Sequence, residues 1–202
     1  MIEGETMRPL IESLPLPFDK VAALGAKIAA ALDAIHRQHV VHLDLKPSNV
    51  MLRASGEAVL IDFGFSRHTR LPDILAEEFP APMGTGPYIS PEQLLGVRDD
   101  ARSDLFALGV MLHFFVTGER PFGDPVGVRA WRRRLYREPP PPRARRPDCP
   151  PWLQEIILRC LEIDPERRYP SAAQAAFDLQ HPEQVELTAR SERTEAGGML
   201  SA

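Results

Sequence analysis

Residues 103–117 are apolar on nearly every side, and no other segment constrains the fold as strongly. Gly118 follows as a stop signal, and the apolar members are Leu105, Phe106, Leu108, Val110, Met111, Leu112, Phe114, Phe115 and Val116. A helix without a polar face must be covered by other elements on all sides. The run is too short to cross a bilayer and contains His113, so no membrane contact is expected. The sequence therefore predicts a mainly α domain built around a buried central helix.

Further helices are predicted where apolar residues recur every three or four positions. One spans residues 19–38 with Asp19 as its start signal, and another contains the apolar stripe of residues 152–161. A last helix begins with the capping pair Ser171 and Gln174 and ends near residue 180. Two short β-prone runs, residues 50–52 and 58–61, predict a small hairpin. Residues 181–202 are polar without a period, and we expect a disordered tail or linker there.

Charge and cysteine content narrow the functional classes. The formal net charge of −4 gives no general case for nucleic-acid binding. The arginines among residues 132–137 and 143–146 could bind nucleic acid or an acidic peptide, but we favour a solvated helix face followed by a polyproline connector. Cys149 and Cys160 lack the spacing of metal ligands or of a disulfide framework. With no signal peptide recognisable at the N-terminus, these features predict a cytoplasmic protein.

The residues that carry chemistry gather in two short stretches. Residues 42–49 read His-Leu-Asp-Leu-Lys-Pro-Ser-Asn, and Asp62-Phe63-Gly64 begins eighteen positions after Asp44. Asp44 can accept a proton from a hydroxyl, and Lys46 can neutralise charge on a phosphate during transfer. Asn49 and Asp62 offer the hard oxygen ligands that Mg²⁺ prefers. An isolated Asp is usually a helix cap and an isolated Asn a turn residue. The combination, with a proline that favours a loop, predicts phosphoryl transfer.

This pattern, H-x-D-x-K-P-x-N followed by D-F-G, resembles that of protein kinases of the serine/threonine type, over about residues 2–180. The resemblance implies a kinase-like C-lobe, a helical bundle around a buried central helix with a small β-hairpin at the catalytic cleft. Residues 62–92 would form the activation segment, ending in the family pattern G-T-x-x-Y-x-A-P-E with Ser90 in place of alanine. The family's small β lobe, with its Gly-rich loop and strand lysine, has no counterpart here. We therefore expect a hinge at about residues 1–6, the C-lobe of a catalytic domain over residues 1–180, and an N-lobe supplied by a longer full-length chain.

The resemblance also implies individual roles. Asp44 and Lys46 would be catalytic, and Thr85 would contact both and help to select a Ser or Thr acceptor. ATP would be bound through Lys46, Asn49, Met51 and Asp62, and Mg²⁺ through Asn49 and Asp62. Met51 would form the floor under the adenine ring; the commoner use of methionine, filling a gap in the core, stays open beside it.

Supporting roles are implied for residues around this site. The His42 ring would hold the catalytic loop and the D-F-G backbone. Asp104 would hold the backbone of that loop, or else act as an ordinary acid at a helix N-terminus. Arg168 would pair with Glu92 beneath the activation segment. Where the family often has an arginine that binds a phosphate on the activation loop, this chain has Leu43, so we expect its activity to be independent of such a phosphate.

The expected function is transfer of the γ-phosphoryl group of ATP to a Ser or Thr hydroxyl of a protein substrate. The alternative is a catalytically impaired fragment, or a regulatory or interaction module of kinase-like fold. It arises because half of the nucleotide site would lie in the N-lobe, so the C-lobe alone should bind ATP poorly. A small-molecule phosphotransferase is disfavoured by Lys46, Pro47 and residues 90–92, and a tyrosine acceptor by the D-L-K-P loop.

Overall fold

The computed structural model describes residues 4–78 and 82–195. In these residues the helices are α1 Arg8–Glu12, α2 Phe18–His36, α3 Ile74–Glu78, α4 Pro91–Leu94, α5 Arg102–Thr117, α6 Val128–Trp131, α7 Pro151–Cys160, α8 Ala172–Gln180 and α9 Ala189–Glu192. The strands are β1 Glu5–Thr6, β2 Val40–Val41, β3 Val50–Leu52, β4 Ala58–Leu60 and β5 Arg67–His68. Short 3₁₀ turns are η1 Pro47–Asn49, η2 Arg132–Leu135, η3 Pro142–Ala144, η4 Pro165–Arg167 and η5 Pro182–Gln184.

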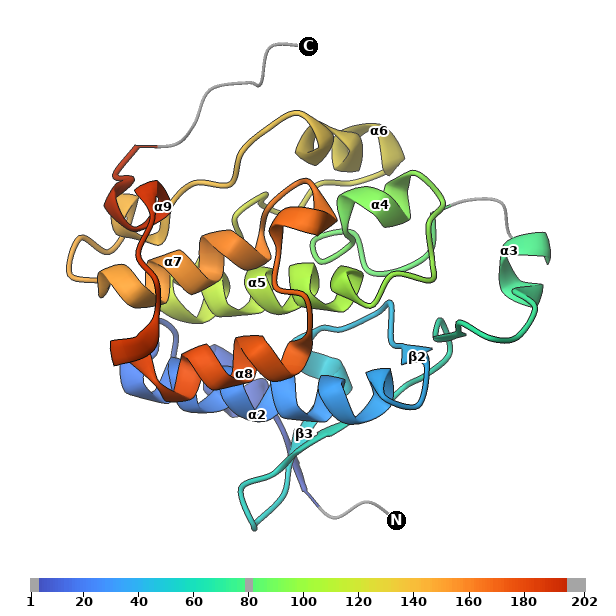
Figure 1. Ribbon diagram of the computed structural model, residues 1–202, viewed down its shortest axis with the longest axis horizontal. Helices are drawn as coiled ribbons and strands as arrows, with labels where there is room; N and C mark the ends of the chain where they lie inside the picture. Colours follow the sequence, from blue (N-terminus) through green and yellow to red (C-terminus); the bar gives the residue numbers. More distant parts are fainter. Residues whose placement is uncertain (1–3, 79–81, 196–202) are drawn as a thin grey trace.

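Helix α5 is the centre of the molecule, as predicted. It packs against α7 and α2, and α8 lies alongside α2 (Figure 1). All of its residues from Ser103 to Val116 are buried, and Gly118 ends the helix in the left-handed conformation at φ 75°. Gly109 lets α7 approach closely, because a Cβ at this position would lie 2.7 Å from the Cβ of Cys160. None of the helices in the described residues is long and apolar enough to cross a membrane.

The two outer helices follow their predicted patterns closely. Helix α2 begins at Phe18, one residue before the expected start at Asp19, and its apolar positions Val21, Leu24, Ile28 and Leu32 are buried. Helix α8 is capped by Ser171, whose Oγ accepts a hydrogen bond of 3.3 Å from the Gln174 N–H. The mainly α fold, a helical bundle around a buried central helix, is therefore confirmed.

Two small antiparallel sheets hold the loops that carry the motifs. Strands β3 and β4 form the predicted hairpin, and β1 adds a third strand beside β3, in a segment where we expected only a hinge. Strand β2 pairs with β5. Because β2 leads into residues 42–49 and β5 follows residues 62–64, this second pairing brings the two chemical stretches side by side.

The segment after α8 differs from its prediction. We expected residues 181–202 to be disordered, but up to residue 195 they form η5 and α9 and pack against α7. The buried carboxylate of Glu155 accepts hydrogen bonds from the N–H and Oγ1 of Thr188, at 3.0 and 2.9 Å, and from Arg190 at 3.0 Å. The buried Gln154 amide donates to the carbonyl of Ser191 at 3.1 Å. Such long-range bonds leave no period in the sequence, so the prediction is wrong as far as residue 195; residues 196–202 lie outside the described residues.

Candidate active site

The loop of residues 42–49, the expected catalytic loop, is held by hydrogen bonds to a buried carboxylate at the start of α5. Asp104, only 1% exposed, accepts the backbone N–H groups of His42 and Leu43, both at 2.8 Å, and lies 2.8 Å from Nε2 of His36 at the end of α2. A buried acid requires such partners. The central helix therefore sets the position of the loop. Of the two roles expected for Asp104, holding the backbone of this loop is confirmed.

The His42 ring joins the two chemical stretches. Its Nε2 lies 3.1 Å from the carbonyl oxygen of Ile61, the residue before Asp62, and its Nδ1 accepts the N–H of Asp44 at 3.3 Å. With Nδ1 as an acceptor, Nε2 is the ring nitrogen that can donate to this carbonyl. The ring is fully buried and packs on Phe63 with centroids 5.0 Å apart. His42 is thus structural, as expected.

The predicted catalytic residues form one hydrogen-bonded cluster around the carboxylate of Asp44. Lys46 Nζ donates to Asp44 Oδ2 at 2.6 Å and to Thr85 Oγ1 at 2.8 Å, and Thr85 Oγ1 donates to Asp44 Oδ1 at 2.6 Å. Asn49 donates from Nδ2 to Asp44 Oδ2 at 3.1 Å and to the Asp44 carbonyl at 2.9 Å. Three side chains thus fix the orientation of one carboxylate, and Thr85 comes from a segment some forty positions away, as the resemblance implied.

Asp62 lies beside this cluster through the backbone. The Ile61 N–H donates to the carbonyl of Asn49 at 3.0 Å, which places Asp62 next to the residue expected to share a metal with it. Asp62 is exposed and has φ 64°, and the buried Leu43 has φ 63°. Left-handed backbone at residues other than glycine is strained, and such strain concentrates at functional sites where surrounding contacts enforce it. At Leu43 those contacts are Asp104 on the N–H and Gln93 on the carbonyl.

The oxygens of Asn49 and Asp62 fit a magnesium ion. Because Asn49 Nδ2 donates to Asp44, its Oδ1 faces away from that carboxylate. Among the described residues this oxygen accepts a single long hydrogen bond, of 3.4 Å from Ser48 Oγ. In the part of the chain that the structure describes, Asp62 Oδ1 accepts one long hydrogen bond, of 3.4 Å from the N–H of Gly64. Across residues 4–78 and 82–195 no group of three His, Cys, Asp or Glu side chains could hold a metal. Two oxygen ligands suffice for Mg²⁺, which keeps several waters and takes phosphate oxygens from its substrate.

Met51 lies in the middle of β3, between Thr6 of β1 and Val59 of β4. It is half-buried, whereas the preceding Val50 is completely buried. A gap-filling methionine would be enclosed by the core. The partial exposure therefore favours the interpretation that Met51 offers an apolar surface to the adenine ring over that of a gap-filling core residue.

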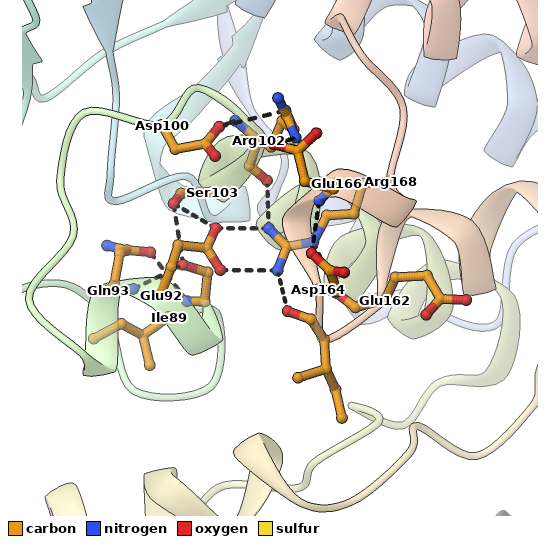
Figure 2. Close-up of polar contacts among 12 residues, drawn as sticks. Ile89, Glu92, Gln93, Asp100, Arg102, Ser103, Glu162, Asp164, Glu166 and Arg168 are labelled. Atoms are coloured by element: carbon orange, nitrogen blue, oxygen red, sulfur yellow. Dashed lines mark hydrogen bonds and ion pairs between the residues drawn. The ribbon is translucent and has the colours of Figure 1, made fainter.

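The end of the activation segment is anchored by a buried ion pair. Arg168 donates to the Glu92 carboxylate from both terminal nitrogens, at 2.6 and 2.8 Å, and Ser103 Oγ donates to the same carboxylate at 2.6 Å. Figure 2 marks these contacts with dashed lines. Burial alone would raise the pKa of Glu92, but the hydrogen bonds and positive charge of Arg168 outweigh it and lower that pKa. The remaining guanidinium N–H groups donate to the backbone carbonyls of Glu162, Arg102 and Ile163, of which the first two residues are labelled in Figure 2. The expected Glu92–Arg168 pair is confirmed.

Two neighbouring residues have roles that the sequence did not reveal. Gln93 is buried and donates from Nε2 to the carbonyls of Leu43 at 2.9 Å and Met83 at 3.2 Å, so it ties the activation segment to the catalytic loop. Ser90 and Gln93 form a capping box at the start of α4. A serine followed three positions later by glutamine signals such a cap, and that signal was present at residues 90–93.

Ion pairs of Asp73 hold the middle of the activation segment, one within the segment and one to Arg98 beyond its end. Asp73 pairs with Arg98 at 2.9 Å and with Arg67 at 3.4 Å, and Arg98 also donates to the carbonyl of Phe65 at 3.0 Å. Two arginines on one anion resemble the arrangement that a phosphate would adopt. Leu43, in contrast, is buried and contributes no charge there.

Comparison with known proteins agrees with this geometry. The family model of the protein kinase domain matches residues 1–182. A probable serine/threonine-protein kinase of Clostridium perfringens is 32% identical over 89% of this chain and 26% of its own length. Serine/threonine-protein kinase PknB of Mycolicibacterium smegmatis is 31% identical over 100% of this chain and 33% of its own length, and PknB of Mycobacterium tuberculosis is 32% identical over 99% and 34%. The chain spans a quarter to a third of the length of these relatives. With a family match over most of its residues, the chain belongs to the protein kinase domain family.

Proposed function

We propose that this chain forms the C-lobe of a protein serine/threonine kinase, which transfers the γ-phosphoryl group of ATP to a Ser or Thr hydroxyl of a protein. The observation that carries the proposal is the cluster around Asp44, in which Lys46, Asn49 and Thr85 all bond the same side chain. Catalysis of phosphoryl transfer consists largely of positioning and of electrostatic stabilisation. A carboxylate held from three directions meets the first requirement, and an ammonium group 2.6 Å away meets the second.

Each side chain has a defined task in this proposal. Asp44 orients the acceptor hydroxyl and takes its proton, a role that needs an oxygen with a fixed direction. Lys46 places its positive charge where the transferred group gains negative charge. Thr85 spans Asp44 and Lys46 with its single hydroxyl, and it brings the activation segment, on which an acceptor peptide would lie, against the proton acceptor.

The metal and the nucleotide would lie between the two loops. Asn49 Oδ1 and the Asp62 carboxylate would hold Mg²⁺, which neutralises phosphate charge when bound. Met51 would supply an apolar surface for the adenine ring from β3. The ion pairs of Asp73 with Arg98 and Arg67 support activity without a phosphate on the activation segment.

Labelled ATP tests the proposal in the full-length protein. Incubation with Mg²⁺ and a protein acceptor should transfer the γ-phosphate, and acid hydrolysis should release the label as phosphoserine or phosphothreonine. The Asp62→Asn variant should need about tenfold more Mg²⁺ for half-maximal rate, because one charged ligand is lost. Asp19→Asn, an exposed acid in the first turn of α2, is the matched control and should behave as wild type.

The outcomes separate the candidate functions. Label on Ser or Thr supports the protein kinase. Label recovered only on a small molecule would favour a phosphotransferase of kinase-like fold. Absence of transfer from Mg²⁺-ATP by the full-length protein would contradict the proposal and favour the interaction module.

A further inference from the structure

Arg134, on η2, is a buried cation. It is 2% exposed, and within the described residues it forms no ion pair with an acidic side chain. The other arginines of residues 132–137 are exposed, so our interpretation of this run as a solvated face is wrong for Arg134 alone. Burial lowers its pKa to about 10, which leaves the guanidinium charged at neutral pH. A buried charge is costly unless its N–H groups are all directed at acceptors.

The two terminal nitrogens of Arg134 donate to the backbone carbonyls of one loop, while Nε donates to the carbonyl of Trp131 at 3.2 Å. Nη2 donates to Gly86 at 2.8 Å, and Nη1 donates to Pro87 at 3.3 Å and to Ile89. The loop of residues 84–89 belongs to no helix or strand, so these carbonyls lack the partners that a regular element would give them. The planar guanidinium of Arg134 therefore supplies the hydrogen bonds that a helix or sheet would otherwise give to these carbonyls.

Two aromatic rings complete the attachment. The guanidinium lies 5.1 Å from the ring centroid of Phe122, a cation–π contact that offsets part of its burial cost. Trp131 packs directly on the loop, since a Cβ at Gly86 would lie 2.5 Å from its Nε1. The ring is itself fixed by a hydrogen bond of 2.8 Å from Nε1 to the carbonyl of Pro125.

The residue that Arg134 holds is adjacent in sequence to a member of the Asp44 cluster. Gly86, whose carbonyl Arg134 holds, directly follows Thr85, whose hydroxyl bonds Asp44 and Lys46. The carbonyl of Thr85 also accepts the N–H groups of Tyr88 at 2.8 Å and Ile89 at 3.2 Å, which makes the loop a compact turn. Fixing the carbonyls of this turn therefore fixes the side chain at its first residue.

We propose that Arg134 is a positioning residue for phosphoryl transfer: by holding the carbonyls of Gly86, Pro87 and Ile89, it places Thr85 on Asp44 and shapes the surface that receives the acceptor. The proposal rests on the function proposed above, because it assigns a role in the same reaction. It concerns the acceptor side of the site, since the hydrogen bonds of Arg134 within the described residues go to residues 86–89 and Trp131, and none goes to Met51, Asn49 or Asp62.

Steady-state kinetics of the full-length Arg134→Met and Arg134→Lys variants test the proposal. In Arg134→Met, kcat/KM for a protein acceptor should fall by about tenfold or more, a loss of about 1.4 kcal/mol of transition-state stabilisation, while KM for ATP stays within about twofold. Arg134→Lys keeps the charge without the fork and should be intermediate. Arg132→Met, an exposed neighbour on the same 3₁₀ turn, is the matched control and should leave both constants unchanged.

Hydrogen exchange gives a readout that does not depend on activity. In Arg134→Met, the amides of Tyr88 and Ile89 should exchange about tenfold faster, whereas those of α5 should keep their protection. Unchanged exchange in residues 84–90, or equal losses for acceptor and ATP, would overturn the proposal. Faster exchange throughout the chain would also overturn it, because Arg134 would then stabilise the whole fold. An inactive wild-type protein would refute the proposed function, and exchange would still decide whether Arg134 orders the loop.

Discussion

Removing Arg168 should reveal how firmly the activation segment is anchored. Its side chain is 0% exposed and that of Glu92 is 7% exposed, so Arg168→Met would leave a carboxylate in the interior with Ser103 as its remaining side-chain partner. Breaking one side of a buried ion pair costs about 3–5 kcal/mol, mostly because the other charge is left without compensation. In a domain of this size each kcal/mol lowers Tm by about 2–4 °C. We expect a loss of about 10 °C.

Chemical denaturation followed by circular dichroism measures this free energy, and the control is close at hand. Arg167 is 66% exposed and lies 3.9 Å from Glu162, so Arg167→Met should change the unfolding free energy by less than about 0.5 kcal/mol. The double variant Glu92→Met with Arg168→Met should be more stable than either single variant, because no unpaired charge remains. If Arg168→Met unfolded within about 1 kcal/mol of wild type, the pair would not anchor the segment as argued.

Two further predictions concern the central helix. Burial lowers the pKa of His113 to about 4, against opposing hydrogen bonds to the carbonyls of Glu119 and Pro140. Between pH 6.5, its ordinary pKa, and about pH 4, His113 binds a proton in the unfolded chain but not in the folded one. The unfolding free energy should therefore fall by about 1.4 kcal/mol for each pH unit of acidification in this range. Denaturation of His113→Gln at several pH values should lack this contribution to the slope, and equal slopes for variant and wild type would contradict the burial argument. Gly109→Ala should lower the unfolding free energy by about 1–3 kcal/mol in the same assay, because the added Cβ would overlap Cys160. A variant as stable as wild type would mean that α7 can move away from α5 at no cost.

The sequence predicted the elements whose signal is local. The central helix, the hairpin of β3 and β4, and the helix capped by Ser171 each depend on periodicity or on a cap within a few residues. The cluster of Asp44, Lys46 and Thr85 was found because the motif names all three residue types.

What the sequence did not predict depends on contacts between distant residues. Arg134 is flanked by exposed arginines of the same type, and only the fold distinguishes the one whose side chain turns toward the loop of residues 84–89. Thr188 reads as an ordinary polar residue until Glu155, thirty-three positions earlier, is found buried beneath it. Strand β1 has only two residues, and its partner β3 lies more than forty positions later. Such pairings have no period to detect.

The most direct test of the central claim compares the full-length wild-type protein with Asp44→Asn. This substitution keeps the shape of the side chain and removes its capacity to take a proton, so the rate of phosphoryl transfer should fall by about 100- to 10,000-fold. Asp99→Asn, an exposed acid outside the site, should retain the wild-type rate. A folded Asp44→Asn protein that transfers phosphate at the wild-type rate would contradict the account.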